Sequence, residues 1–212
     1  MNKRNLLLYA ITDCKRSKDA VLYEQVEQAL SGGATLIQLR EKEIDEYSFE
    51  KEIREIKKLC NRFAVPLIIN DYVELALRSG ADGVHVGKSD MPVDQIRKLA
   101  GNDFIIGATT KTVEQAKAAE ENGADYLGVG AVFPTNTKEN VIRITIPQLK
   151  EIVSSTDLPS VAIGGIKLSN MHLLKDCGAD GIAVVTAVFA AADIKKATEE
   201  LRKEAEKIIH FN

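Results

Sequence analysis

Short runs of β-branched and aliphatic residues recur along the whole chain. Within each run the apolar residues stand next to one another instead of alternating with polar ones, a pattern typical of a strand that is buried on both faces. We expect strands over residues 6–12, 35–40, 66–70, 83–87, 104–109, 126–133, 160–164 and 181–188.

The segments between these runs have the features of helices. Segments such as 21–30 and 53–59 carry apolar residues at helical spacing. A glycine stands near the end of four of the intervening segments, where it can adopt the left-handed conformation that ends a helix. These endings read Ser31-Gly32-Gly33-Ala34, Ser79-Gly80-Ala81-Asp82-Gly83, Gly123-Ala124-Asp125 and Gly178-Ala179-Asp180-Gly181.

Strand and helix therefore alternate in about eight units, and this number of parallel strands closes into a (β/α)8 TIM barrel. The even spacing leaves no room for a linker, so we expect one domain over residues 1–212. An open, doubly wound α/β sheet is the alternative. No G-x-G-x-x-G follows the first strand, which weakens that alternative.

Composition narrows the class of partner. Hydrophobic residues make up 45% and charged residues 28% of the 212, which suits a folded core with a solvated surface. A net charge of −3 gives no general attraction to nucleic acid or to an anionic membrane, so we expect small-molecule partners. The first apolar run is too short for a signal peptide or a membrane span, which favours a cytoplasmic protein. The sequence leaves a homo-oligomer open.

The cysteines and histidines offer little chemistry of their own. Cys14, Cys60 and Cys177 form no close pair, so we expect buried thiols and neither a disulfide framework nor a zinc site. His85 lies inside a predicted strand, where a packed, hydrogen-bonded imidazole is the favoured interpretation over an acid-base group.

Functional residues of such a barrel gather where the strands end. The second strand ends in Gln38, Arg40 and Lys42, which alternation places on one side, toward the barrel mouth. A solvated strand end with an ordinary salt bridge is the alternative interpretation for Arg40.

Carboxylates follow the next two strands. Asp71 comes directly after Asn70 at the end of the third strand, and Asp90 lies in the loop after the fourth. From neighbouring loops the two carboxylates would face each other and suit Mg²⁺, which takes one or two carboxylates together with substrate phosphates. Asp90 could instead cap a helix that begins near Pro92.

Phosphate-binding groups follow three later strands. The loop 133–138 combines the hydroxyls of Thr135 and Thr137 with the ammonium of Lys138, although a plain turn could use the same residues. Gly164-Gly165 and Val185-Thr186 end the seventh and eighth strands, where barrels often bind phosphate through backbone amides. A tight turn is the alternative for the glycine pair.

The whole series of motifs resembles the thiamine-phosphate synthase family in order and spacing over nearly the full chain. The motifs are Gln38-x-Arg40-x-Lys42, Asn70-Asp71, residues 80–87, Asp90, Phe133-Pro134-Thr135-x-Thr137-Lys138 and residues 161–166. The resemblance implies a transferase that joins an aminopyrimidine methyl diphosphate to a thiazole phosphate in the presence of Mg²⁺, and releases pyrophosphate.

The resemblance also implies roles for particular residues. Arg40, Lys42, Asn70, Thr109 and Lys138 would hold the diphosphate, and Asp71 and Asp90 would bind the metal. Thr135 and Thr137 would support the phosphates, Gln38 would contact the pyrimidine, and Gly165, Val185 and Thr186 would bind the thiazole phosphate. Arg40, Lys42, Thr109 and Lys138 would be the catalytic groups, since the reaction needs charge stabilisation and no protein nucleophile.

The sequence departs from the family pattern at several positions. Thr109 and Thr186 are exchanges at hydroxyl-bearing positions, Lys88 and Lys111 add positive charge near the mouth, and Ala131 and residues 141–146 change the thiazole side. Two other functions stay open at this point: an isomerase of the thiazole phosphate, and a non-catalytic protein that binds thiamine phosphates. The diphosphate and metal residues favour the synthase over both.

Overall fold

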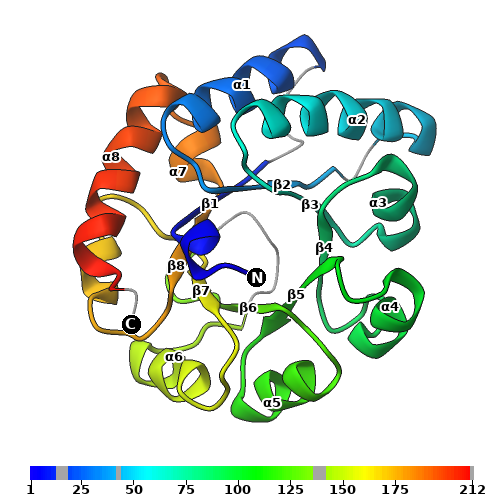
Figure 1. Ribbon diagram of the computed structural model, residues 1–212. Helices are drawn as coiled ribbons and strands as arrows, with labels where there is room; N and C mark the ends of the chain where they lie inside the picture. The colour runs from blue at the N-terminus through cyan, green and yellow to red at the C-terminus, as the bar shows by residue number, and fades with distance from the viewer. Residues whose placement is uncertain (13–18, 42–43, 136–141, 211–212) are drawn as a thin grey trace.

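The eight predicted strands form a closed parallel barrel, in which each strand pairs with its neighbours in sequence and β1 pairs with β8. The structure, a computed structural model, describes residues 1–12, 19–41, 44–135 and 142–210. Its strands are β1 (Leu8–Ile11), β2 (Leu36–Leu39), β3 (Leu67–Asn70), β4 (Gly83–Val86), β5 (Ile105–Thr110), β6 (Tyr126–Gly130), β7 (Ser160–Ile163) and β8 (Gly181–Val184). Figure 1 looks along the barrel, with the helices arranged around it. The predicted (β/α)8 fold is confirmed.

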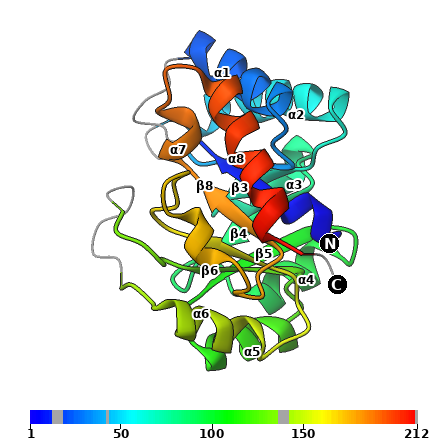
Figure 2. The ribbon, with the colours of Figure 1, turned by 90° about the vertical axis from the view of Figure 1, so that its left-hand side faces the viewer.

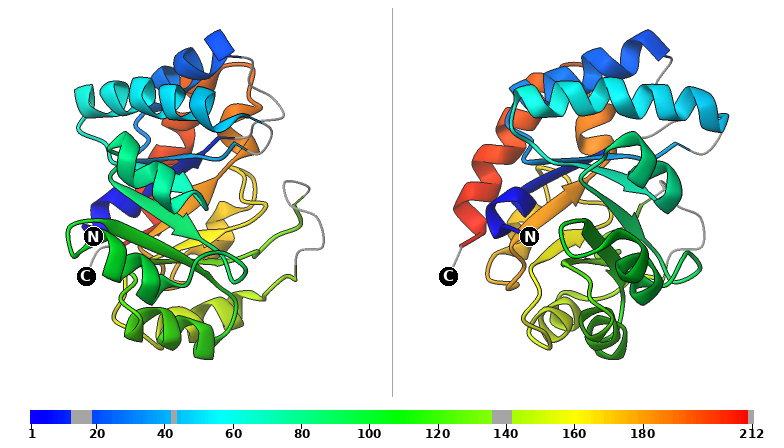
Figure 3. Two further views of the ribbon diagram at one scale, coloured as in Figure 1. Left: turned by 90° about the vertical axis from the view of Figure 1, so that its right-hand side faces the viewer. Right: turned by 45° about the vertical axis from the view of Figure 1, so that its right-hand side comes forward.

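Helices cover the outside of the barrel (Figure 1). They are α1 (Asp19–Ser31), α2 (Glu46–Arg62), α3 (Val73–Ser79), α4 (Val93–Ala100), α5 (Val113–Glu121), α6 (Ile146–Val153), α7 (Thr186–Phe189) and α8 (Ile194–Ile208), with 3-10 helices η1 (Lys3–Leu6) and η2 (Met171–Leu174). The N-terminus and the end of α8 lie at the same end of the barrel (Figures 2 and 3). In the part of the chain that is described, no helix is long and apolar enough to span a membrane.

Alternation along the strands separates two apolar cores. Tyr9 and Ile11 point into the barrel and pack with Leu36, Ile68 and other residues of the inner cluster. The intervening positions, such as Leu8 and Ala10, join a larger cluster between strands and helices. Both faces of each strand are therefore buried, which explains why the sequence shows continuous apolar runs.

A repeated hydrogen bond ties the strands in pairs at their N-terminal ends. The residue just before each even-numbered strand accepts, with its side chain, a backbone N–H at the start of the preceding odd-numbered strand. These bonds join Leu8 N to Thr35 Oγ1 (2.8 Å), Leu67 N to Asp82 Oδ2 (2.7 Å), Ile106 N to Asp125 Oδ2 (2.7 Å) and Ser160 N to Asp180 Oδ2 (2.9 Å). We call these four interactions the strand clamps. They satisfy N–H groups that would otherwise be buried without an acceptor.

The aspartates of three strand clamps also bind a cation. Lys57 of α2 contacts Asp82 at 2.7 Å, Arg97 of α4 contacts Asp125 at 2.6 Å, and Lys3 of η1 contacts Asp180 at 3.0 Å. The Gly-Ala-Asp repeats, which the sequence predicts only as helix endings, thus also bind neighbouring strands. The helix endings themselves are confirmed at Gly80, the left-handed C-cap of α3 with a φ of 76°.

Three parts of the predicted pattern differ from the structure. Residues 131–133 were expected to continue the sixth strand, but β6 ends at Gly130. Residues 185–188 were expected to continue the last strand, but β8 ends at Val184 and α7 begins at Thr186. Their β-branched, apolar composition is typical of a strand. In the structure one helical turn buries Val188 and Phe189 instead. Between β7 and β8 the regular helix is replaced by the short η2, because the segment 164–180 contains backbone turns with positive φ at Gly164, Gly165 and Asp176.

Candidate active site

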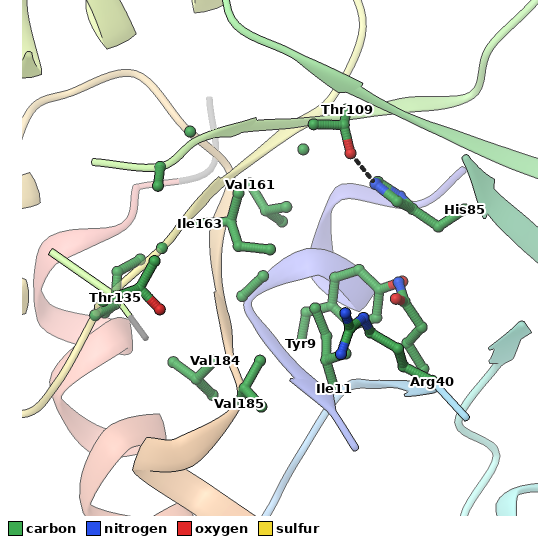
Figure 4. Close-up of a pocket in the computed structure, with 18 of the residues that line it drawn as sticks. Tyr9, Ile11, Arg40, His85, Thr109, Thr135, Val161, Ile163, Val184 and Val185 are labelled. Atoms are coloured by element: carbon green, nitrogen blue, oxygen red, sulfur yellow. Dashed lines mark hydrogen bonds between the residues drawn. The ribbon is translucent and has the colours of Figure 1, made fainter. Parts of the chain in front are cut away.

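A pocket of about 240 Å³ opens at the C-terminal ends of the strands. Residues from all eight strands or from the loops that follow them line it: Tyr9, Ile11, Gln38, Arg40, Asn70, His85, Thr109, Lys111, Gly128, Gly130, Ala131, Thr135, Val161, Ile163, Gly164, Gly165, Ile166, Ala183, Val184, Val185 and Thr186. Figure 4 shows labelled side chains of β1, β4, β5, β7 and β8 around this space. This is the barrel end at which functional groups are expected to meet.

One side of the pocket carries the positive charge. Arg40 follows β2, and its backbone N–H donates to the buried hydroxyl of Thr12 at 2.9 Å, which fixes where the side chain leaves the strand. Lys111 follows β5, and its N–H donates to the side chain of Gln115 at 2.8 Å. Among the described lining residues these two are the charged ones, so the pocket favours anions.

The opposite side is formed by the loops after β6, β7 and β8. Gly165 has a φ of 63°, and a Cβ atom there would stand 2.2 Å from the carbonyl oxygen of Pro134. The glycine therefore permits both a left-handed turn, which was the alternative for this pair in the sequence, and the close approach of two loops. Thr135, Val185 and Thr186 line the pocket beside it.

Apolar side chains separate the two polar sides. Ile11, Val161, Ile163 and Val184 line the pocket from β1, β7 and β8 (Figure 4). A flat organic ring can be buried against such a surface while its charged substituents reach the polar sides.

A row of hydrogen bonds crosses the barrel at the base of the pocket. Gln38 Nε2 donates to the hydroxyl of Tyr9, and that hydroxyl lies 2.9 Å from the hydroxyl of Tyr126. The Tyr126 hydroxyl lies 3.0 Å from His85 Nδ1, and His85 Nε2 lies 2.9 Å from Thr109 Oγ1. The last of these bonds is drawn in Figure 4. We call these five residues the polar row.

The polar row is deeply buried. Tyr9, Gln38, His85 and Tyr126 are at most 7% exposed. Burial raises the pKa of both tyrosines above the ordinary value of 10.0, so both phenols keep their protons at neutral pH. His85 is confirmed as a buried, hydrogen-bonded imidazole, and it also lines the pocket, which the sequence did not predict.

Glycines in β5 and β6 make room for the polar row. A Cβ atom at Gly107 would stand 2.2 Å from Tyr126 Cζ and 2.5 Å from His85 Nδ1, and one at Gly128 would stand 3.0 Å from His85 Cε1. Two large polar side chains can therefore cross the interior only because these inward positions carry no side chain.

The two predicted metal ligands follow neighbouring strands. Asp71 has a φ of 65°, and its N–H donates to the carbonyl oxygen of His85 in β4 at 3.0 Å. Asp90 Oδ2 accepts the N–H of Gly87 at 2.7 Å. The alternative role of Asp90 as a helix cap is wrong, because Pro92 is the N-cap of α4 and no side chain caps that helix.

The pocket brings together most of the predicted substrate residues. Gln38, Arg40, Asn70, Thr109, Thr135, Gly165, Val185 and Thr186 all line it. Asp71 lines a separate depression beside α2 and α3, and Asp90 is part of the β4–α4 loop. Lys42, Thr137 and Lys138 lie outside the described residues, as does Cys14, whereas Cys60 and Cys177 are free and buried as expected.

Several lining residues were not predicted. Tyr9 and Tyr126 look like ordinary strand residues in the sequence, although a buried tyrosine hydroxyl needs a hydrogen-bond partner. Inward-facing glycines at 107 and 128 on neighbouring strands were a second available signal. Lys111, noted only as a departure from a family pattern, lines the pocket.

Fold and pocket together define a (β/α)8-barrel protein with a strand-end pocket that combines two positively charged side chains, glycine-containing loops and an apolar wall. A family model described as "Thiamine monophosphate synthase" matches residues 8–188. The chain belongs to this family, and the resemblance seen in the sequence is confirmed.

Curated relatives match over almost their whole length. A thiamine-phosphate synthase of Methanobrevibacter smithii is 45% identical over 96% of this chain and 97% of its own. That of Pyrococcus abyssi is 46% identical over 98% of both chains. A solved thiamine phosphate pyrophosphorylase from Pyrococcus furiosus superposes with a TM-score of 0.90 at 40% identity, covering 98% of this chain and 99% of that one.

A more distant solved structure shares the fold alone. The (S)-3-O-geranylgeranylglyceryl phosphate synthase of Thermoplasma acidophilum superposes with a TM-score of 0.73 at 15% identity, covering 97% of this chain and 96% of that one.

Proposed function

We propose that this protein is a thiamine-phosphate synthase, a transferase that joins an aminopyrimidine methyl diphosphate to a thiazole phosphate and releases pyrophosphate. The observation that carries the proposal is the division of the pocket: cationic and hydroxyl groups after β2 and β5, backbone-rich loops after β7 and β8, and an apolar surface between them. Two phosphate-bearing rings can occupy such a site with their reacting atoms adjacent. Membership of the family supports the same activity.

The proposed chemistry needs no protein nucleophile. The bond between the methylene carbon and the diphosphate oxygen breaks, pyrophosphate leaves with the electron pair, and the thiazole nitrogen attacks the methylene carbon. The electron-rich pyrimidine ring spreads the positive charge that develops. The protein then has two tasks, to stabilise the leaving group and to align the two rings.

Arg40 has the main role in the first task among the described residues. Its guanidinium, together with Thr109 and Lys111 of the same pocket lining, would hold the diphosphate and stabilise its charge as the bond breaks. Lys42 and Lys138 are proposed to contribute in the same way on the strength of the family resemblance. Gly165, Val185 and Thr186 would bind the thiazole phosphate, chiefly through backbone amides.

The donor groups near the pocket fit Mg²⁺. Asp71 and Asp90 supply carboxylates from neighbouring loops, and the bond from Gly87 N–H holds Oδ2 of Asp90, so that Oδ1 is the oxygen Asp90 would offer to a metal. The described residues include no group of three or more His, Cys, Asp or Glu side chains placed to hold a metal. Mg²⁺ commonly uses only one or two carboxylates together with waters and substrate phosphates. When bound, it would neutralise charge on the diphosphate.

One assay tests the activity. Purified protein is incubated with both substrates and Mg²⁺, and thiamine phosphate and pyrophosphate are measured as products. Equal amounts of the two, lost when a chelator is added, are expected. Conversion of a thiazole phosphate without coupling, or binding without turnover, would reject the proposal in favour of the isomerase or the non-catalytic binding protein.

A variant tests the metal site separately. Asp71→Asn removes one carboxylate charge with little change of shape, so the Mg²⁺ concentration needed for half-maximal activity should rise. An unchanged dependence of activity on Mg²⁺ concentration would show that Asp71 does not bind the metal. It would not contradict the proposed coupling activity.

A further inference from the structure

The polar row runs through the barrel interior and links two strands, β2 and β5, that contribute to the positive side of the pocket. It begins at Gln38 in β2, passes through Tyr9 in β1, Tyr126 in β6 and His85 in β4, and ends at Thr109 in β5. Both end residues line the pocket. Each of the three middle residues is hydrogen-bonded to its neighbours in the row, so the direction of one hydrogen bond determines the direction of the next.

With one hydrogen on the imidazole, counting hydrogen atoms limits the row to two arrangements. Each phenol has one hydrogen to donate, and both phenols are protonated because burial raises their pKa. If Tyr9 receives a hydrogen bond from Gln38, its own hydrogen points to Tyr126, and the hydrogen of Tyr126 points to His85. If Tyr9 donates to Gln38 instead, each of these bonds reverses.

The position of the Gln38 amide selects the first arrangement. Gln38 Nε2, which can only donate, faces the Tyr9 hydroxyl. His85 Nδ1 then accepts from Tyr126, so the imidazole proton sits on Nε2 and is donated to Thr109 Oγ1. Thr109 accepts this bond and directs its own hydroxyl hydrogen elsewhere.

We propose that Tyr9, Tyr126 and His85 are positioning residues that set the polarity of the pocket, so that Gln38 offers a hydrogen-bond acceptor and Thr109 offers a donor. A ligand with a ring amino group near Gln38 and an anionic oxygen near Thr109 matches both ends at once. A ring carbonyl near Gln38 would require the amide to rotate so that its nitrogen faces the ligand and its oxygen faces Tyr9. Every hydrogen bond of the row would then reverse, and the Thr109 hydroxyl would donate to His85 instead of to the anion. The choice of ring and the binding of the anion are thus coupled.

This inference deepens the proposed function and rests on it for the identity of the ligand, but its central claim concerns the protein alone. The tautomer of His85 can be read from the nitrogen chemical shifts of its ring in the ¹⁵N-labelled protein. Replacing the exposed His172 and His210 by Gln leaves His85 as the one imidazole of the chain. We expect the ring hydrogen of His85 on Nε2 and none on Nδ1. A proton on Nδ1 would overturn the proposal.

A matched pair of substitutions tests the coupling. Tyr126→Phe keeps the ring and its packing but removes the hydroxyl that links Tyr9 to His85. Tyr23→Phe removes a hydroxyl that accepts a bond from Arg62 on the outer surface. Each variant is assayed for kcat/KM with the aminopyrimidine diphosphate and with its analogue that has a carbonyl in place of the amino group.

Wild-type protein and Tyr23→Phe should discriminate strongly between the two compounds. Tyr126→Phe should lose about tenfold or more of this discrimination, because Gln38 can then turn without a cost at Thr109. The His85 signals of Tyr126→Phe should also lose their single tautomer, a change that a merely structural role would not cause. Unchanged discrimination in Tyr126→Phe would overturn the proposal.

The two proposals can fail separately. If the wild-type protein shows no coupling activity but His85 carries its proton on Nε2, the proposed function fails and the ordered row stands. If coupling is observed and His85 carries its proton on Nδ1, the synthase stands and the ordered row fails.

Discussion

The strand clamp at Asp82 should contribute to stability without affecting catalysis. Its carboxylate accepts the N–H of Leu67, a residue with no exposed surface, and binds the ammonium of Lys57 at 2.7 Å. Asp82→Ala removes both interactions. The clamp lies at the N-terminal end of the barrel, opposite the pocket, so kcat/KM should not change.

The size of the effect follows from the burial of the partners. A buried N–H left without its acceptor costs about 1–3 kcal/mol, and a partly exposed ion pair adds about 0–1 kcal/mol. The Asp82 side chain is 31% exposed, so water can reach part of the site and a loss of about 2 kcal/mol is expected. For a chain of this length that loss corresponds to a fall in Tm of about 4–8 °C.

Two further variants separate the contributions. Asp82→Asn keeps an oxygen for the Leu67 N–H but loses the charge opposite Lys57, and should lower stability by about 1 kcal/mol or less. Asp103→Ala removes an exposed aspartate before β5 and should have little effect. Thermal and urea unfolding measure all three. A Tm for Asp82→Ala equal to that of Asp103→Ala, or an Asp82→Asn variant as unstable as Asp82→Ala, would refute the reasoning.

Three more predictions concern the pocket. Arg40→Ala should lower kcat/KM for coupling by about 10²-fold, the usual cost of one lost transition-state charge partner, and a near-normal rate would remove Arg40 from the leaving-group site. Gly165→Ala should destabilise the protein more than Gly80→Ala. Both glycines have a positive φ, but only at Gly165 would the new Cβ atom meet a backbone carbonyl oxygen, 2.2 Å away. Equal losses of Tm in the two variants would contradict this. Burial raises the pKa of Tyr9 and Tyr126 above the ordinary 10.0. The folded state therefore keeps phenol protons that the unfolded chain releases at high pH. The contribution of these protons to the free energy of unfolding is complete below about pH 10 and should be lost as the pH rises beyond it. Urea unfolding across this range should show a shallower decline in Tyr9→Phe, whereas parallel curves would reject the cause.

Local sequence patterns were sufficient to predict the strands and their order. A strand buried on both faces has a continuous apolar run in its sequence. A glycine such as Gly80 marks the end of a helix, because a positive φ is energetically unfavourable for residues with a Cβ atom. The same reasoning failed at residues 185–188. There β-branched residues form a helical turn, since burial of Val188 and Phe189 against the core outweighs their local preference.

The polar row and the strand clamps could not be predicted in the same way. Tyr9, His85 and Tyr126 are far apart in the sequence and meet only through the register of the closed barrel. The acceptor role of Asp82 likewise depends on an N–H in another strand. By contrast, Gln38, Arg40 and Thr109 were predicted as site residues because the family resemblance and the strand-end rule point to the same positions, and all three line the pocket.

The seam between β1 and β8 determines when the cylinder can close. Leu8 pairs with Ile182 and Ala10 with Val184, and Lys3 reaches Asp180 across the same seam. A nascent chain therefore keeps one edge of β1 open until β8 has left the ribosome, when the seven other strands are already made. Slow synthesis of the last quarter of the protein would prolong the exposure of that edge and favour association between unfinished chains.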